Sequence, residues 1–249
     1  KDFNSITAEN DMKPQPTEPA YGQFNWENAD KIANFCRSNG IKLRGHCLMW
    51  HAQIGKWMYQ DEKGNLVSKE KLFQNMKHHI TAIMERYKDV VYAWDVVNEA
   101  ISDGGRPVMG QKPSPYRNSP LYQIAGDEFI KKAFIYARKA DPNVLLFYND
   151  YNAADPQKRD RIYNMVKSMK EEGVPIDGIG MQGHYNIYGP SMEDVDAALT
   201  KYSTIVKHIH ITELDIRANE EMGGHLNFSR EAGDISQTVK LLQEDQYTR

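Results

Sequence analysis

Residues 90–100 read VVYAWDVVNEA, a run of apolar and β-branched residues that is long enough for one buried strand. The run ends in the carboxylate of Glu99 beside the amide of Asn98, and the chain then enters a loop rich in Gly and Pro. Residues 208–215, HIHITELD, repeat this design and place Glu213 after a second strand. Buried strands with polar residues at their ends are a common way to build an active site on a parallel sheet. The sequence therefore predicts a site that contains two carboxylates.

The composition argues against several classes of partner. With 40% hydrophobic and 26% charged residues among 249, the chain is typical of a globular protein with one large domain or two small ones. A net charge of −3 offers no basic field, so we expect a neutral substrate and no nucleic acid. No apolar run approaches the ~20 residues of a membrane-spanning helix, so we expect no membrane insertion. Cys36 and Cys47 are expected in the core without a disulfide between them.

Hydrophobic periodicity predicts six units, each a strand followed by a helix. The strands are expected at residues 3–8, 41–48, 90–100, 144–148, 176–181 and 208–212. The helices are expected around residues 29–36, 72–87, 129–136, 156–169, 195–202 and 235–242. Local signals mark several helix ends: Gly40 and Gly173 at C-termini, Asp155 as an N-cap before Pro156, and Ser191 in a capping box.

Strictly alternating units imply a parallel sheet covered by helices, either an open doubly wound sheet or a closed (β/α)8 TIM barrel. The first strand has no Gly-rich fingerprint and the chain has no P-loop, which weakens the nucleotide-binding version of the open sheet. Polar residues follow the ends of different strands: Glu9, Asn10, His46, Asn98, Glu99, Asn149, Gln182, His184 and Glu213. Closure of a barrel brings all these ends to one mouth, whereas an open sheet spreads them along an edge. The α/β TIM barrel is therefore the predicted fold class.

Two carboxylates that face each other across a neutral mouth suggest cleavage of an acetal. A glycosidic bond needs one protonated carboxyl for the leaving oxygen and one ionised carboxylate at the oxocarbenium-like centre. If His184 donates to Glu213 and bridges to Asp215, it keeps Glu213 ionised, and Glu99 then carries the shared proton. Rings that stack on sugars are expected in or beside the mouth from Trp50, Trp57, Tyr148, Tyr151, Tyr185 and Tyr188. Hydroxyl-binding partners are expected from Asn10, Lys13, Gln53, Asn98 and Gln182.

Five motifs occur in order from the first residues to the last. They are TAENDMK (7–13), RGHCLMWH (44–51), WDVVNE (94–99), GIGMQGH (178–184) and ITELD (211–215). Together they resemble the successive signatures of glycoside hydrolase family 10, the retaining endo-β-1,4-xylanases. The resemblance implies a (β/α)8 barrel with Glu99 as the acid/base and Glu213 as the nucleophile. It also implies that Asn98 lies near the 2-hydroxyl of the cleaved sugar and that His184 and Asp215 support the nucleophile.

The resemblance also implies where the substrate binds and where the enzyme acts. It places Glu9, Asn10, Lys13, His46, Trp50, Gln53 and Gln182 along the glycone subsites, and we add Asn149 and Tyr151 as substrate-binding residues. It implies xylan and xylo-oligosaccharides as ligands, with no cofactor and no metal in catalysis. It further implies a secreted, periplasmic or cell-surface location, with a targeting signal outside this chain.

One departure concerns completeness, because an eight-stranded barrel needs two more units than the six predicted here. The family order places one missing unit before Lys1 and one after Arg249. We therefore expect residues 1–249 to be a single catalytic domain that is incomplete at both ends. A further segment that completes the barrel, or an attached carbohydrate-binding module, is the expected partner.

Two other classes of protein compete with the xylanase interpretation. One is a non-hydrolysing carbohydrate-binding protein, or an inactive fragment of such a domain. The other is a metal-dependent barrel enzyme such as a sugar isomerase.

Overall fold

The computed structural model describes residues 3–104 and 114–218, and its centre is a parallel sheet. The order of strands in this sheet is β1-β2-β3-β4-β5-β7, with every neighbouring pair parallel. The strands are β1 (Ser5–Thr7), β2 (Lys42–Trp50), β3 (Val91–Asn98), β4 (Leu145–Asp150), β5 (Gly178–Met181) and β7 (His208–Ile211). All six predicted strands are thus confirmed, in chain order.

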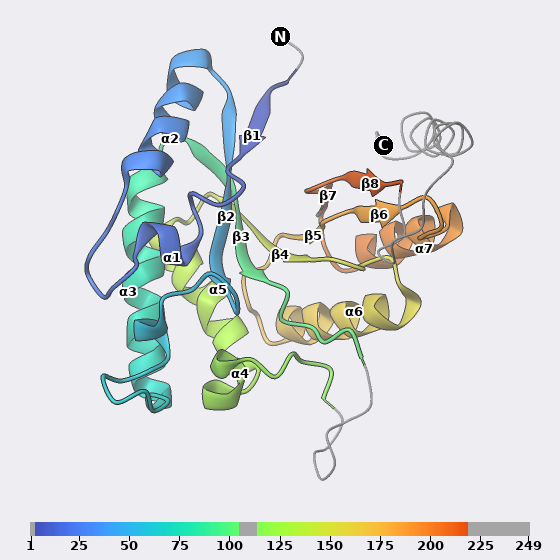
Figure 1. Ribbon diagram of the computed structural model, residues 1–249. Coiled ribbons are helices and arrows are strands. Elements are labelled where there is room, and N and C mark those ends of the chain that lie inside the picture. Colours follow the sequence, from blue (N-terminus) through green and yellow to red (C-terminus); the bar gives the residue numbers. More distant parts are fainter. Residues whose placement is uncertain (1–2, 105–113, 219–249) are drawn as a thin grey trace.

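The helices follow one another around the outside of the curved sheet, which Figure 1 shows from α2 through α7. They are α1 (Pro14–Thr17), α2 (Glu27–Asn39), α3 (Lys69–Tyr87), α4 (Pro120–Ala125), α5 (Glu128–Ala140), α6 (Pro156–Glu171) and α7 (Met192–Ser203), with a 3-10 turn, η1 (Lys56–Met58). Their apolar stripes face the sheet, and the α3 stripe of Leu72, Met76, Ile80 and Ile83 is fully buried. The predicted helix around residues 235–242 lies outside the described residues.

The predicted local signals act where the sequence places them. Gly40 ends α2 with φ 61°, a left-handed conformation that glycine adopts without a steric penalty. The side chain of Asp155 accepts hydrogen bonds from the backbone N–H groups of Gln157 and Lys158 at the start of α6. Ser191 caps α7 by accepting from the backbone N–H of Asp194. These caps fix where α6 and α7 begin, next to the ends of the strands that carry polar residues.

Several short elements were not predicted from the sequence, including α1 and η1. The short helix α4 precedes α5, capped by the side chain of Ser119. A separate two-stranded parallel sheet joins β6 (His184–Asn186) to β8 (Asp215–Arg217), directly after β5 and β7. Runs of three residues are too short for a periodicity signal. This small sheet fixes the backbone of His184 beside that of Asp215.

Side chains on the inner face of the sheet connect strands that are not neighbours. Nη1 of Arg44 in β2 lies 2.9 Å from Nδ1 of His210 in β7, although β3, β4 and β5 separate these strands in the sheet. Four strand spacings of a flat sheet would place the two strands about 19 Å apart. The sheet must therefore curl toward a barrel, with Arg44 and His210 facing one another across its interior.

The outer strands of the sheet are less buried than the central ones. Every residue of β7 is only partly buried, and Ile6 in β1 is 37% exposed, whereas β3 is almost entirely buried.

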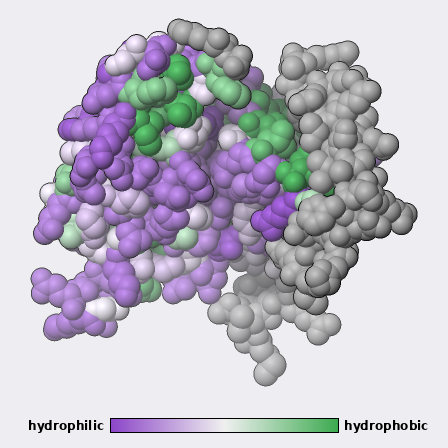
Figure 2. Space-filling view, turned by 45° about the horizontal axis from the view of Figure 1, so that its top comes forward, coloured by the Kyte–Doolittle hydropathy of each residue, from purple (hydrophilic) through white to green (hydrophobic). Residues whose placement is uncertain are grey.

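Figure 2 shows a mostly hydrophilic face on which apolar side chains gather in a few places. The incompleteness of the domain at both ends stays a prediction. No helix in the described ranges is long and apolar enough to cross a membrane.

The contact between Arg44 and His210 leads to a prediction about pH. Burial, together with repulsion from Arg44, lowers the pKa of His210 to about 4. His210 is therefore neutral near pH 7, so its Nδ1 can accept a hydrogen bond from Arg44. In the unfolded chain the pKa returns to about 6.5, so the unfolded state binds the proton more readily between these values. Stability should consequently fall as the pH drops from about 6.5 toward about 4.

The substitution His210→Gln tests this linkage, because glutamine retains an acceptor for Arg44 but does not titrate. We expect the free energy of unfolding of the variant to fall less than that of the wild type across this pH range. Urea unfolding at a series of pH values measures the difference. Parallel curves for the two proteins would contradict the assignment.

Candidate active site

Glu99 and Glu213 each stand one or two residues beyond the end of a parallel strand. Glu99 directly follows β3, and its backbone N–H donates to the carbonyl of Asn149 over 2.9 Å. The backbone N–H of Glu213, after β7, donates to the carbonyl of Gln182 over 2.8 Å. Both carboxylates are therefore held by extensions of the strand hydrogen bonding, and both side chains are partly exposed. The structure confirms that the two predicted carboxylates share the mouth of the sheet.

Three buried amides connect the two carboxylates. Nδ2 of Asn149 donates to Oε1 of Glu213 (2.9 Å) and to Oδ1 of Asn98 (3.0 Å). Nε2 of Gln182 donates to the same Asn98 oxygen (3.1 Å) and to Oε1 of Glu99 (3.0 Å). Each amide nitrogen has two hydrogens, so both are used. The chain from Glu213 through Asn149, Asn98 and Gln182 to Glu99 fixes the two carboxylates relative to one another.

The second oxygen of Glu99 meets the residues of the predicted sugar-binding side. Nε1 of Trp50 donates to Oε2 of Glu99 over 2.8 Å, and Nζ of Lys13 lies 4.8 Å from the centre of the Trp50 ring. Lys13 also donates to Oδ1 of Asn10 (2.8 Å), which lies 3.3 Å from Nε2 of Gln53. The structure thus brings these four predicted residues into one group beside Glu99.

His184 bridges the second carboxylate to Asp215, as predicted. Its Nε2 lies 3.0 Å from Oε2 of Glu213, and its Nδ1 makes a short contact with Oδ2 of Asp215. Burial alone would lower the pKa of His184, but the hydrogen bond and the attraction to Asp215, with a smaller contribution from Glu213, raise it above its ordinary value. A protonated His184 donates to both carboxylates.

Two hollows lie on either side of His184. One, of about 450 Å³, is lined by Thr7, Ala8, Glu9, Lys13, His46, Asp95, His184, Thr212 and Glu213. The other, of about 470 Å³, includes Asp103, Asn152, Gln157, Lys158, His184, Tyr185 and Asn186 in its lining. Glu9 is placed by the first hollow, which it lines together with Lys13 and His46. His184 borders both hollows, and Glu213 borders the first.

His46 is held by another protein side chain as well as bordering the first hollow, so it does more than bind substrate. Its side chain is buried, and Nδ1 lies 2.9 Å from Oδ2 of Asp95, while the residue also borders the first hollow. Trp94 and Asp95 are both buried. Within the described residues, no group of three or more His, Cys, Asp or Glu side chains could hold a metal ion.

The expectation that aromatic rings at the mouth stack on sugars needs correction. Tyr148 is fully buried and its hydroxyl binds backbone groups, so it cannot stack on a sugar. Tyr185 is also buried. The Trp57 indole packs against the core and donates to the carbonyl of Glu18 over 2.8 Å, which makes it part of the scaffold. Tyr188 is 66% exposed. Alternating residues of a strand point to opposite faces, and a strand with both faces covered gives no signal for which side an aromatic ring takes.

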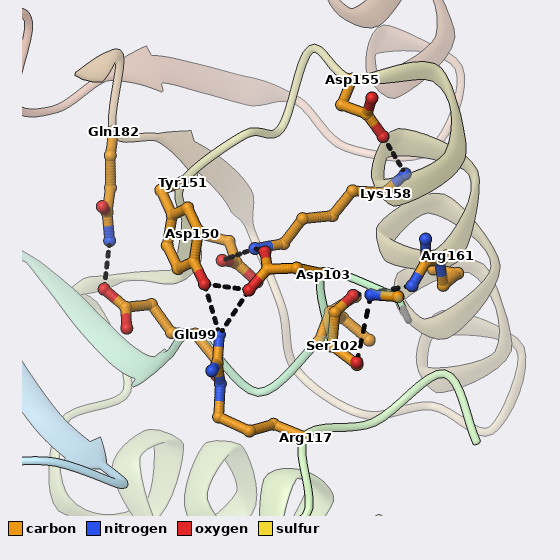
Figure 3. A network of polar contacts seen from close by, with 12 residues as sticks. Glu99, Ser102, Asp103, Arg117, Asp150, Tyr151, Asp155, Lys158, Arg161 and Gln182 are labelled. Atoms are coloured by element: carbon orange, nitrogen blue, oxygen red, sulfur yellow. Dashed lines mark hydrogen bonds and ion pairs between the residues drawn. The ribbon is translucent and has the colours of Figure 1, made fainter. Parts of the chain in front are cut away.

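The sequence analysis missed a group of charged residues beside Glu99, shown in Figure 3. Asp103, Arg117 and Lys158 surround Tyr151, whose hydroxyl accepts from Arg117 over 2.7 Å and donates to Asp103. Nζ of Lys158 lies 3.4 Å from the centre of the Tyr151 ring. The hydroxyl and one face of Tyr151 are thus occupied by protein groups. A lysine in the first turn of an amphipathic helix reads as solvent-exposed, so its burial could not be predicted from spacing.

Comparison with known proteins agrees with this geometry. The sequence profile of Glycosyl hydrolase family 10 matches residues 1–248. An endo-1,4-beta-xylanase/feruloyl esterase of Xylanibacter ruminicola is 58% identical over the whole chain, which spans 35% of that relative. The chain therefore covers about a third of the length of this relative.

Solved structures give the same result. A psychrophilic glycoside hydrolase family 10 endo-beta-1,4-xylanase superposes with a TM-score of 0.90 at 68% identity, covering 97% of this chain and 74% of that one. An intracellular xylanase of Thermoanaerobacterium saccharolyticum, solved with xylotriose, has a TM-score of 0.86 at 36% identity, covering 96% of this chain and 72% of that one. These relatives are (β/α)8 barrels, which confirms the predicted fold class. The chain belongs to glycosyl hydrolase family 10.

Proposed function

We propose that this chain is the catalytic part of an endo-1,4-β-xylanase, which cleaves internal bonds of xylan with retention of configuration. The observation that carries the proposal is the fixed pair of Glu99 and Glu213, joined through three amides, with a hollow beside Glu213. Retaining glycosidases need two carboxyl groups held in such a relation, one as acid and one as nucleophile. Cleavage of internal bonds is supported by the family and by the relatives named endo-1,4-beta-xylanases.

In the first step, a carboxylate oxygen of Glu213 attacks the anomeric carbon while Glu99 donates its proton to the glycosidic oxygen. The bond from the anomeric carbon to the leaving oxygen breaks, and a glycosyl ester on Glu213 forms. Protonated His184 places a positive charge beside the attacking carboxylate of Glu213. The oxygen of Glu213 that accepts from Asn149 remains held during this step.

In the second step, Glu99, now ionised, removes a proton from water as the water attacks the anomeric carbon of the ester. The ester bond breaks, Glu213 leaves as a carboxylate, and Glu99 regains its proton. The hydrogen bonds from Trp50 and Gln182 hold Glu99 through both steps. Asn98 lies between the two carboxylates, where a sugar 2-hydroxyl would come within its reach.

The sugar-binding residues and the place of action belong to the same proposal. Lys13, Asn10, Gln53 and Trp50 would hydrogen-bond or stack on the sugars before the cleaved bond, with Glu9 and His46 at the adjoining hollow. We also propose that the enzyme acts outside the cytoplasm. Fractionation of the source cells checks this location, and finding the enzyme in the cytoplasmic fraction alone would contradict it.

Substitution of the two carboxylates separates their roles. We expect Glu213→Ala to abolish turnover of every substrate, because no ester can form. Glu99→Ala should lower kcat/KM on xylan by about 10²- to 10⁴-fold, yet largely spare a dinitrophenyl xylobioside, whose leaving group needs no proton. Steady-state kinetics on both substrates measure the difference. Equal losses on the aryl substrate for the two variants would contradict the assigned roles.

Removal of metal ions distinguishes the proposal from a metal-dependent sugar isomerase. The expected mechanism moves protons and a glycosyl group only between carboxyl groups, sugar and water. Exhaustive dialysis against a chelator should therefore leave xylan hydrolysis unchanged, as measured by reducing-sugar release. Loss of activity that returns with added divalent cations would favour the metal-dependent alternative.

A further inference from the structure

The backbone at Glu99 adopts an unusual conformation. Its φ is 56°, in the left-handed region that non-glycine residues seldom occupy. Such a conformation persists only where the surroundings hold it. The direction of the Glu99 carboxyl depends on this turn, because the side chain leaves the backbone at that point.

One hydroxyl holds the residues that follow the turn. The backbone N–H groups of Ala100 and Ile101 both donate to the hydroxyl oxygen of Tyr148, each over 3.0 Å. This hydroxyl in turn donates to Oδ2 of Asp150 over 2.5 Å. Among the described residues, the Tyr148 hydroxyl binds only these two N–H groups and Asp150.

Asp150 is held in turn by a buried lysine. Nζ of Lys158 lies 2.8 Å from Oδ1 of Asp150, and all three of Tyr148, Asp150 and Lys158 have at most 1% of their surface exposed. Burial raises the pKa of Asp150 to about 6, although Lys158 and the Tyr148 hydroxyl both oppose this rise. Removing a carboxylate and an ammonium group from water is unfavourable, and apolar side chains would fill the same space. A polar group set in this place therefore calls for a reason other than packing.

The network returns to Glu99 from its other side, as Figure 3 shows. Lys158 donates to Oδ1 of Asp103 over 2.7 Å, and Asp103 accepts from Tyr151. Arg117 donates to the Tyr151 hydroxyl over 2.7 Å and, through Nε, to the backbone carbonyl of Glu99 over 2.9 Å. The turn at Glu99 is thus held at its own carbonyl and at the two following N–H groups.

We propose that Tyr148, Asp150 and Lys158 form a positioning relay that holds the turn at Glu99, so that the carboxyl of Glu99 points at the leaving oxygen. The inference rests on the proposed role of Glu99 as the acid. At the turn the relay binds the backbone N–H groups of Ala100 and Ile101. Among the described residues, the hydrogen bonds and ion pairs of Tyr148, Asp150 and Lys158 do not include Glu213. Loosening it should therefore impair proton donation and leave attack by Glu213 largely intact.

The substitution Tyr148→Phe tests the relay, because it removes one oxygen and keeps the ring. We expect kcat/KM for phenyl xylobioside, a poor leaving group, to fall roughly 10- to 100-fold, and for dinitrophenyl xylobioside to fall less than about threefold. Tyr87→Phe is the matched control. Tyr87 is equally buried but lies in α3, outside the relay, and the substitution removes one hydrogen bond, to Asp30. The control should leave the ratio of the two kcat/KM values unchanged.

The outcomes separate this inference from the proposed function. Equal losses on both substrates, or no loss, would overturn the relay. If Tyr148→Phe does not fold, Asp150→Asn decides, because it retains an acceptor for Tyr148 but loses the charge beside Lys158. It should change the ratio in the same direction, and an unchanged ratio would overturn the relay. If instead Glu99→Ala itself shows no dependence on the leaving group, the proposed role of Glu99 fails.

Discussion

The carboxylate of Asp95 binds the side chains on which the interior of the barrel depends. Its two oxygens contact the guanidinium of Arg44, and one of them lies 2.9 Å from Nδ1 of His46. Burial opposes ionisation of Asp95, but Arg44 and then His46 outweigh it and lower the pKa of Asp95. With Asp95 satisfied by Arg44, the remaining Arg44 nitrogen reaches His210 across the sheet. Breaking a buried pair of this kind typically costs about 3–5 kcal/mol, because one charge is left unpaired.

The contact between Arg44 and His210 requires a curved sheet, and the curvature brings the ends of distant strands to one mouth. Buried amides at this mouth then hold the two carboxylates. Asn98, Asn149 and Gln182 come from three strand ends that are adjacent in the sheet. Because both amide hydrogens of Asn149 and of Gln182 are used, buried side chains on three strand ends set the spacing of the two carboxylates. The strained turn at Glu99 belongs to the same arrangement, since it directs one carboxyl out of a buried strand and into the mouth.

The sequence predicted those parts of the molecule that depend on local pattern. The six strands, five of the six helices and the N-cap at Asp155 follow from periodicity and capping. The bridge from His184 to both Glu213 and Asp215 was expected from the chemistry of two unequal carboxylates. The buried Lys158 and Arg44 were not expected, because their partners lie up to 166 residues away and a charged residue gives no local sign of burial. For the same reason Tyr148 was assigned to the mouth, although its ring and hydroxyl are buried beneath it.

The central claim is that Glu213 forms a covalent bond to the sugar while Glu99 controls protons. The most direct test is incubation with a dinitrophenyl 2-deoxy-2-fluoro-xylobioside. Its fluorine slows both formation and hydrolysis of the ester, whereas its good leaving group speeds formation alone, so the ester accumulates. Mass spectrometry of the intact protein and of its peptic peptides then locates the label. The account predicts one fluoro-xylobiosyl group, attached to the peptide that contains Glu213. A label on Glu99, or the absence of any label on a protein that hydrolyses xylan, would contradict it.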